Sequence, residues 1–186
     1  IRDDVESRGL GDVYKRQDVT LIHGETALQP VRFTTDVPIT TAQDMYDAVT
    51  SRFEEMDVLV MAAAVADYRP VTVASDKIKK KDGDLSIPVE RTADILGTIG
   101  PKKTRQFLCG FSMETRDMVE NSTAKLTRKN LDMVVANNLK VAGAGFGVDT
   151  NVVTFITPDG TRELPLMSKA DVADAILDEI LKRRGL

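Results

Sequence analysis

Four lysines stand close together in the stretch DKIKKKDGD at residues 76–84, namely Lys77, Lys79, Lys80 and Lys81. They belong to an acidic chain, in which 25 Lys and Arg residues stand against 29 Asp and Glu residues and the formal net charge is −4. Ammonium groups gathered in this way can bind a polyanion such as a triphosphate. An ordinary solvated loop can carry the same charge run, so further residues are needed to distinguish the two interpretations.

A run of small residues is the second group that could contact a ligand. Ala63, Ala64, Val65 and Ala66 end the most apolar segment of the chain and are followed by Asp67. Small side chains would let a flat ligand lie against the backbone, whose amides and carbonyls could read the edge of a base. Asp67 would then offer a carboxylate to ribose hydroxyls or to a metal ion. The alternative is a packing segment in which Asp67 caps a turn.

A third group lies in a predicted helix near residue 125. Lys125 and Lys129 are four residues apart and therefore share one face of the helix, and Arg128 adds a third positive charge. Like charges at this spacing cost a few tenths of a kcal/mol, roughly, which an anion bound between them would offset. The spacing alone is also compatible with an exposed basic helix face.

Composition excludes several classes of protein. The chain has 186 residues, of which 42% are hydrophobic and 29% charged, which is typical of one globular domain. Its longest apolar run, residues 58–66, is too short for a membrane span of about 20 residues. No apolar stretch near residue 1 indicates a secretory signal. The acidic net charge argues against general binding of nucleic acid.

The single cysteine and the single histidine carry little chemistry. Cys109 cannot form a disulfide within the chain, which fits a reducing cytoplasm. Because His23 is the only histidine, Cys109 is also a weak candidate for a Cys–His nucleophile or a zinc ligand. Both residues are predicted to pack in or beside strands. We therefore expect a cytoplasmic protein that binds neither membranes nor nucleic acid.

Strand and helix signals alternate along the chain. Short apolar or β-branched runs predict strands at 19–23, 31–35, 57–64, 107–112 and 131–138, with 57–64 central because it is apolar on both faces. Helical spacing and N-cap residues predict helices at 40–56 (capped by Thr40 or Thr41), 93–99, 115–129 and from Ser168, paired with Asp171, to Arg183. Residues 84–92 are predicted to be one arm of a hairpin, and 152–157 with 162–166 a second hairpin.

Strands separated by helices predict an α/β fold, Rossmann-like and three-layered, with a mostly parallel sheet and a C-terminal antiparallel hairpin extension. In such sheets ligands bind beyond the carboxyl ends of the strands, here near 64–69, 112–116 and 136–140. Gly143, Gly145 and Gly147 do not form a dinucleotide-binding loop, because a strand follows them where that motif requires a helix. They are predicted to lie in a flexible surface loop.

The first 17 residues fit this pattern badly, because they have no clear period and stop abruptly before a good strand. One interpretation is a helix that leads into the first strand. The other, which we favour, is a non-native or disordered leader joined to a domain at 18–186.

Taken in order, these groups resemble bacterial phosphopantothenoylcysteine synthetase, also called phosphopantothenate–cysteine ligase. The resemblance covers the chain from residue 18 onward, and its combination of AVADY with KxKK is specific. The motifs that carry it are AAAVADYRP at 62–70, KIKKK at 77–81, ADIL at 93–96, GFSMET at 110–115, KxxxKNLD at 125–132 and AN at 136–137.

The resemblance implies a two-step ligation in coenzyme A biosynthesis. CTP, with Mg²⁺, would activate the carboxylate of 4′-phosphopantothenate as an acyl-cytidylate, and the amine of L-cysteine would then displace CMP. It implies a homodimer and, in the bifunctional members of the family, an upstream flavin-dependent decarboxylase domain. It implies that Lys77 is the catalytic lysine and that Lys125 and Lys129 bind the CTP phosphates. The residues that it places around the nucleotide are Ala63, Ala64, Val65, Ala66 and Phe111. Asp67 and Asp94 would contact the ribose or the metal ion, and Asp67 is the main candidate for the metal.

One family motif has no counterpart in this sequence. Members carry a TNxSSGxxG loop, with a strand before it and a helix after it, and its asparagine serves the acyl-cytidylate; the 17 leading residues stand in its place. We therefore expect the domain to lack its first strand, that loop and its first helix, and the chain to ligate cysteine poorly or not at all. The alternative function is a noncatalytic nucleotide-binding or structural module.

Overall fold

A five-stranded sheet lies at the centre of the protein. The computed structural model describes residues 18–29, 31–79, 86–114, 117–138 and 148–186, and all structural statements concern these. The order of the strands is β10-β9-β7-β6-β3. The parallel strands β3 (Val58–Met61), β6 (Phe107–Glu114) and β7 (Met133–Asn138) are followed by antiparallel β9 (Val153–Thr157) and β10 (Gly160–Glu163). This is the predicted α/β fold with its C-terminal hairpin.

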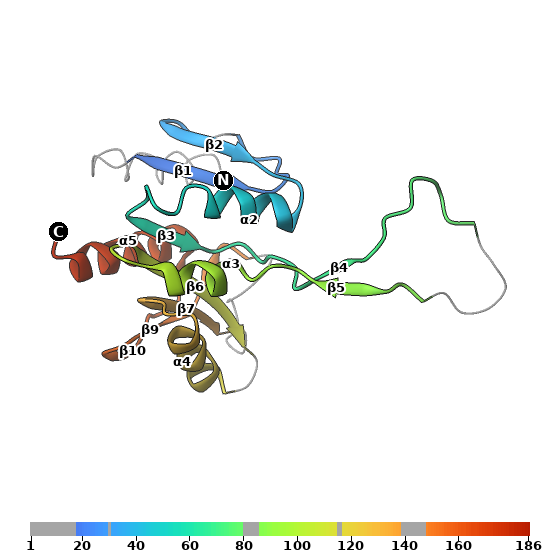
Figure 1. Cartoon of the computed structure of the whole chain (residues 1–186). Helices are drawn as coiled ribbons and strands as arrows, with labels where there is room; N and C mark the ends of the chain where they lie inside the picture. The colour runs from blue at the N-terminus through green and yellow to red at the C-terminus, as the bar shows by residue number, and fades with distance from the viewer. Residues whose placement is uncertain (1–17, 30, 80–85, 115–116, 139–147) are drawn as a thin grey trace.

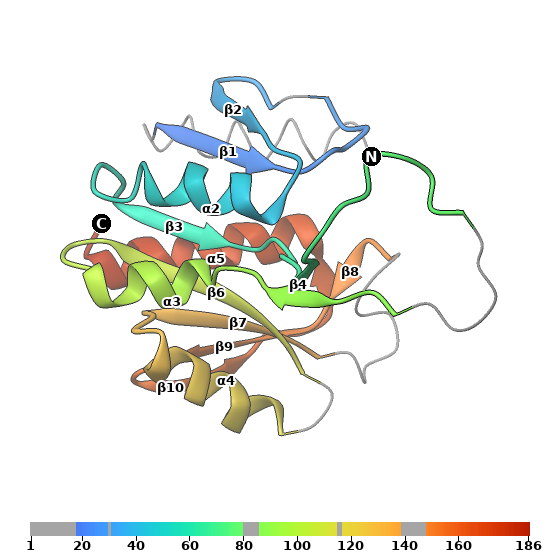
Figure 2. The ribbon, with the colours of Figure 1, turned by 45° about the vertical axis from the view of Figure 1, so that its right-hand side comes forward.

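A separate parallel pair lies beyond the helix next to β3. β1 (Val19–His23) pairs with β2 (Thr34–Pro38), and both views place α2 (Ala42–Thr50) between this pair and β3 (Figures 1 and 2). Thr41 caps α2 through a capping box with Asp44, so of the two predicted caps Thr41 is the one used. His23 ends β1 and contacts Asp36 on β2 at 3.0 Å.

Three other helices complete the layers. α3 (Ile95–Ile99) runs into the 3₁₀ turn η1 (Gly100–Lys102), and α4 (Met118–Arg128) connects β6 to β7. α5 (Lys169–Arg184) begins at Ser168, whose hydroxyl accepts from the amide of Asp171, as the capping pattern predicted. None of the described helices is long and apolar enough to cross a membrane.

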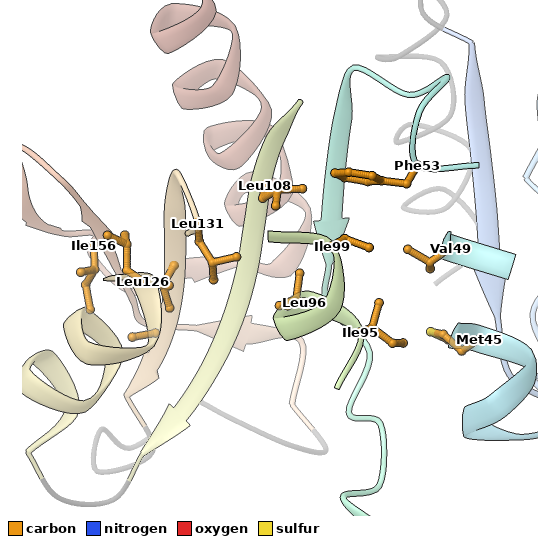
Figure 3. Close-up of a cluster of buried hydrophobic side chains, with 12 residues drawn as sticks. Met45, Val49, Phe53, Ile95, Leu96, Ile99, Leu108, Leu126, Leu131 and Ile156 are labelled. Carbon is orange, nitrogen blue, oxygen red and sulfur yellow. The ribbon is translucent and has the colours of Figure 1, made fainter. Parts of the chain in front are cut away.

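Alternating side chains of the sheet build two cores. Leu108 and Val134 point into a cluster on the side of α2, α3 and α4, whereas their neighbours Cys109 and Val135 point into a cluster on the side of α5. Figure 3 shows the first cluster, in which side chains of α2 face those of α3 and a further group lies beside β6 and α4. The two faces of the sheet are therefore both covered, as expected of a parallel sheet. Burial raises the pKa of the Cys109 thiol to about 12, so this cysteine is a packing residue, as predicted.

A two-stranded arm leads away from this body. β4 (Tyr68–Pro70) and β5 (Val89–Arg91) are antiparallel, and the described residues that adjoin them, 71–79 and 86–88, extend outward from the sheet (Figure 1). Arg69 and Glu90 form an ion pair across it at 2.8 Å. The arm also exposes large apolar side chains, namely Tyr68, Val71, Val73, Ile78, Ile87 and Val89. Two further short strands, β8 (Thr150–Asn151) and β11 (Met167–Ser168), pair with each other.

Several predicted boundaries were wrong. The strand predicted at 31–35 is displaced to β2, because Phe33 has a positive φ of 63° and belongs to a turn. The strand predicted at 57–64 ends at Met61, and alanines, which have low strand propensity, follow it. It is not central either, since β3 is the last strand in the described order. Of the described residues 86–92 of the predicted arm, only those of β5 are paired as a strand.

Some predictions fall outside the described residues. These are the leader at 1–17, Lys80 and Lys81, residues 84 and 85 of the predicted arm, and the glycine loop at 143–147.

Candidate functional site

A pocket of about 390 Å³ opens beyond the carboxyl end of β3 and beside Phe111 of β6, on the side of the sheet where ligands bind in open parallel folds. Its walls come from the exit of β3, the base of the arm, α3 and α4. The lining residues are Met61, Ala63, Val65, Ala66, Asp67, Tyr68, Arg91, Thr92, Ala93, Asp94, Ile95, Leu96, Phe111, Lys125, Arg128 and Lys129.

The exit of β3 is held in place by Thr92. Its amide donates to the carbonyl of Asp67 at 3.0 Å, and its hydroxyl donates to the carbonyl of Ala66 at 2.5 Å. These two bonds fix a stretch of backbone that has no strand partner of its own. Ala63, Val65 and Ala66 line the pocket, whereas Ala64 is not among the lining residues.

Asp94 has two structural contacts in the pocket. Its Oδ1 accepts from the amide of Gly97 at 2.9 Å and so caps α3. The Lys129 ammonium lies 2.8 Å from Oδ1 and 2.7 Å from Oδ2. Burial opposes ionisation of Asp94, but the hydrogen bonds from Lys129 and Gly97 and the charges of Lys129 and Lys125 outweigh it, so its pKa lies below the ordinary value.

Lys129 reaches Asp94 because Gly100 allows α3 and the end of α4 to touch. A Cβ on Gly100 would clash with the carbonyl oxygen of Lys129. The amide of the Asn130 side chain donates to the carbonyl of Gly100 at 2.9 Å and joins the same two elements. Asn130 adopts a left-handed conformation with φ 51°, which Asn tolerates better than most residues.

Lys125 is held against β6. Its ammonium donates to the carbonyl of Phe111 at 2.5 Å. Burial and the neighbouring charge of Lys129 lower its pKa, against the opposing effect of Asp94 and Glu114. One turn earlier on α4, the buried hydroxyl of Ser122 donates to that of Ser112 on β6 at 3.0 Å. The helix that presents both lysines is thus anchored to the sheet by a buried polar contact.

Asp67 is the second carboxylate that lines the pocket. Its side chain is exposed and forms no ion pair with any described residue. No group of three His, Cys, Asp or Glu side chains among the described residues could hold a metal alone. Mg²⁺ is commonly held by one or two carboxylates together with phosphate oxygens and water. The residues present therefore fit a magnesium ion that arrives with a phosphate ligand.

Lys77 lies elsewhere. It is on the exposed segment between β4 and β5 and is not among the residues that line the pocket. The structure thus brings together Asp67, Asp94, Phe111 and the two lysines of α4, and leaves Lys77 on the arm.

Sequence reasoning assigned no role to four residues with polar groups that line the pocket: Tyr68, Arg91, Thr92 and Arg128. Arg128 was visible as a charge beside Lys125 but received no role. Thr92 and Arg91 gave no sequence signal, because their place in the pocket depends on the pairing of β5 with β4.

Comparisons with known proteins agree with one another. Residues 13–183 match the family described as DNA/pantothenate metabolism flavoprotein C-terminal domain. The chain is 48% identical, over 164 residues, to the coenzyme A biosynthesis bifunctional protein CoaBC of Bacillus subtilis (strain 168); the match covers 87% of this chain and 40% of that protein. The chain thus spans less than half the length of that curated relative.

Two solved structures are similar in fold. The C-terminal domain of a coenzyme A biosynthesis bifunctional protein CoaBC has a TM-score of 0.77 at 40% identity, covering 96% of this chain and 83% of that one. A Cab2 mutant in complex with phosphopantothenate-cysteine has a TM-score of 0.75 at 17% identity, covering 96% and 76%, which shows a shared fold.

Proposed function

The chain belongs to the DNA/pantothenate metabolism flavoprotein C-terminal domain family, and from this premise we propose that it is a CTP-dependent phosphopantothenate–cysteine ligase domain of coenzyme A biosynthesis. The observation that carries the proposal is the pocket itself. Its lining includes three cations at α4 and its C-cap, Lys125, Arg128 and Lys129, together with small residues at the exit of β3. Its volume of about 390 Å³ lies in the range of small-molecule sites.

The arrangement suits a nucleoside triphosphate. Phe111 and the backbone at Ala63–Ala66 offer a surface for the base, and the cations of α4 offer donors for phosphate oxygens. Charge-assisted hydrogen bonds of this kind are about twice as strong as neutral ones. Lys125 and Lys129 are already oriented by Phe111 and Asp94, so little side-chain entropy is lost when a phosphate replaces those acceptors.

The proposed reaction has two displacements. A carboxylate oxygen of 4′-phosphopantothenate attacks the α-phosphorus of CTP, the bond to the bridging oxygen breaks, and pyrophosphate leaves with the electron pair. The amine of L-cysteine then attacks the acyl carbon, loses a proton, and CMP leaves from the acyl-cytidylate.

The residues of this chain would stabilise the first displacement by charge. Lys125, Arg128 and Lys129 would neutralise the oxygens of the departing pyrophosphate, where preorganised charge lowers the barrier most. Lys77 would add its charge from the arm. When bound, Mg²⁺ supplies a Lewis acid for phosphate oxygens, and Asp67 is the residue that would hold it.

The nucleotide specificity has a direct test. Mg²⁺–CTP at a hundredfold excess over its dissociation constant should stabilise the folded protein by about 2.7 kcal/mol. Mg²⁺–ATP at the same concentration should stabilise it less, because the backbone around Ala63–Ala66 is proposed to read the base edge. A thermal shift that is equal for the two nucleotides, or absent with CTP, would overturn the proposed specificity.

A noncatalytic nucleotide-binding module is the second candidate. The position of Lys77 on the arm, outside the lining of the pocket, favours it, because binding then needs only the residues of the body. Pyrophosphate release from CTP in the presence of 4′-phosphopantothenate, measured with a chain extended by the family's TNxSSG segment, separates the candidates: the ligase releases pyrophosphate, and the module binds CTP without releasing it.

We also propose that the protein is a homodimer and that the arm contributes to the contact. Its exposed apolar side chains, among them Val73 with 83% of its surface exposed, are unusual for a segment that leads away from the body. Sedimentation equilibrium of the wild type and of Val73→Asp tests this, since a dimer that depends on the arm should dissociate in the variant. A flavin-dependent decarboxylase domain fused upstream and a cytoplasmic location remain predictions.

A further inference from the structure

Asp94 and Lys129 form an ion pair inside the pocket in which phosphate groups are proposed to bind. Both carboxylate oxygens lie within 2.8 Å of the ammonium. Only 15% of the Lys129 side chain is exposed, against 54% of the Asp94 side chain, so the carboxylate stands on the open side of the pair. A phosphate that approaches Lys129 therefore meets a bound anion first.

Asp94 can give up Lys129 without losing its position. The amide of Gly97 still donates to Oδ1 at 2.9 Å and keeps the carboxylate over the first turn of α3. Gly97 has no side chain to separate the two groups, since a Cβ there would lie 2.8 Å from Oδ2. Solvent reaches the rest of the carboxylate. The exchange of one acceptor for another at Lys129 thus leaves no buried, unpaired charge.

We propose that Asp94 is an internal anion of the pocket, which competes with ligand phosphates for Lys129 and returns to it when they leave. Asp94 would be a specificity-determining residue that lowers affinity for any phosphate at this position. The inference deepens the proposed function and rests on it for the class of ligand, a polyphosphate.

Two consequences follow for ligands of different size. An anion that contacts Lys129 alone gains little, because it replaces one anionic oxygen by another. A triphosphate also reaches Lys125 and Arg128, which Asp94 does not pair with, and so it overcomes the competition. When the triphosphate has been cleaved, the return of Asp94 to Lys129 favours the release of pyrophosphate.

The experiment measures binding of inorganic pyrophosphate and inorganic phosphate by calorimetry in magnesium-free buffer. The variant is Asp94→Asn, because Asn caps a helix as well as Asp does and removes only the charge. Glu120→Gln is the matched control, since it makes the same charge change on the exposed first turn of α4, outside the pocket. Thermal melting of each variant checks that the fold is intact.

We expect Asp94→Asn to tighten both anions by about fivefold, which corresponds to the attraction between two opposite unit charges about 4 Å apart at a water-like dielectric, the Asp94–Lys129 attraction that an incoming anion no longer has to displace. Glu120→Gln should change affinity less than about twofold, because a screened charge beyond the pocket acts weakly. In a Lys129→Gln background, the further change Asp94→Asn should also have less than about a twofold effect, since the competition acts through Lys129.

Two results would overturn the inference. Weaker binding of the anions to Asp94→Asn would show that Asp94 supports the ligand instead of competing with it. A fivefold gain that persists in the Lys129→Gln background would show a long-range charge effect. Because no nucleotide is used, failure of CTP to bind would leave these measurements valid and would count only against the proposed function.

Discussion

The lysines at α4 and Lys77 on the arm differ in whether their ammonium groups are held by acceptors in the structure. Lys125 lies on α4, which packs against β6, β7 and β9, and Lys129 is the C-cap residue of that helix. Each ammonium has an acceptor within 3 Å, the carbonyl of Phe111 or the carboxylate of Asp94. Lys77 is an exposed residue of the arm and forms no ion pair with any described residue. The body therefore offers preformed cations, whereas the arm offers a cation that must be ordered when a ligand binds.

This difference suggests a division of labour between the two regions. Preformed groups bind ligands at low entropic cost, so their removal should weaken binding as well as lower the rate. A lysine on an arm that gains its contact only in the reacting complex contributes mainly to the transition state. Binding should therefore depend on α4 and the rate on Lys77.

The largest expected effect concerns Lys77. In a chain extended by the family's TNxSSG segment, Lys77→Gln should lower the rate of pyrophosphate release by at least about a hundredfold, since one positive charge placed where negative charge develops in the transition state is worth that much or more. Stability should change by less than about 0.5 kcal/mol, because the residue is exposed. Lys79→Gln is the control on the same segment. Near-normal turnover of Lys77→Gln would contradict the proposal that the rate depends on Lys77.

The next effect is on binding by α4. Lys125→Met keeps the half-buried stem but removes the charge, and should weaken CTP binding by about 10- to 150-fold, the equivalent of one charge-assisted hydrogen bond. Calorimetry with CTP measures it, with Lys102→Met on η1, outside the pocket, as a control. An unchanged dissociation constant would mean that α4 does not bind the phosphates.

A smaller effect should follow from disturbing the support of Lys129. Gly100→Ala places a methyl group against the carbonyl of Lys129 and should cost about 1–3 kcal/mol of stability, as overpacking does. The melting temperature should fall by about 2–4 °C for each kcal/mol lost. Gly24→Ala, where an added Cβ meets nothing within 4 Å, is the matched control. Equal melting of the two variants would contradict the close contact of α3 with α4.

The smallest effect is the pH dependence of the Asp94–Lys129 pair. Because the folded-state pKa of Asp94 is lowered, its contribution to stability is present above the unfolded value near 3.8 and is lost as pH falls through the folded value. Its size should stay below about 1 kcal/mol, since the carboxylate is half exposed and screened. Denaturation of wild type and Asp94→Asn from pH 2 to pH 7 measures it. A difference in the free energy of unfolding between wild type and Asp94→Asn that grows toward low pH would contradict the lowered pKa of Asp94.

Periodicity in the sequence was sufficient to predict the two most buried parallel strands. β6 and β7 begin and end within two residues of their predicted bounds, because an apolar run between polar residues is stable only inside the sheet. The caps at Thr41 and Ser168 were found from local hydrogen-bonding chemistry. The boundary of β2 was missed, since the left-handed conformation of Phe33 depends on a turn that its residue type does not favour.

The site was only partly predictable for a similar reason. Asp67, Asp94, Lys125 and Lys129 were named from motifs, but the motifs did not show that Asp94 pairs with Lys129, 35 residues away. That pair depends on the approach of two helices. The place of Lys77 depends on the course of the arm, which no local pattern encodes.

Gly100 also has a consequence for the order in which the protein folds. Its contact with Lys129 joins residues that are separated along the chain by all of β6 and α4. Closing this loop costs conformational entropy, which is offset by the packing of the β6–α4–β7 unit. The cations that line the pocket, Lys125, Arg128 and Lys129, should therefore reach their final positions late in folding. In a refolding experiment, the recovery of pyrophosphate binding should lag behind the recovery of the helical signal.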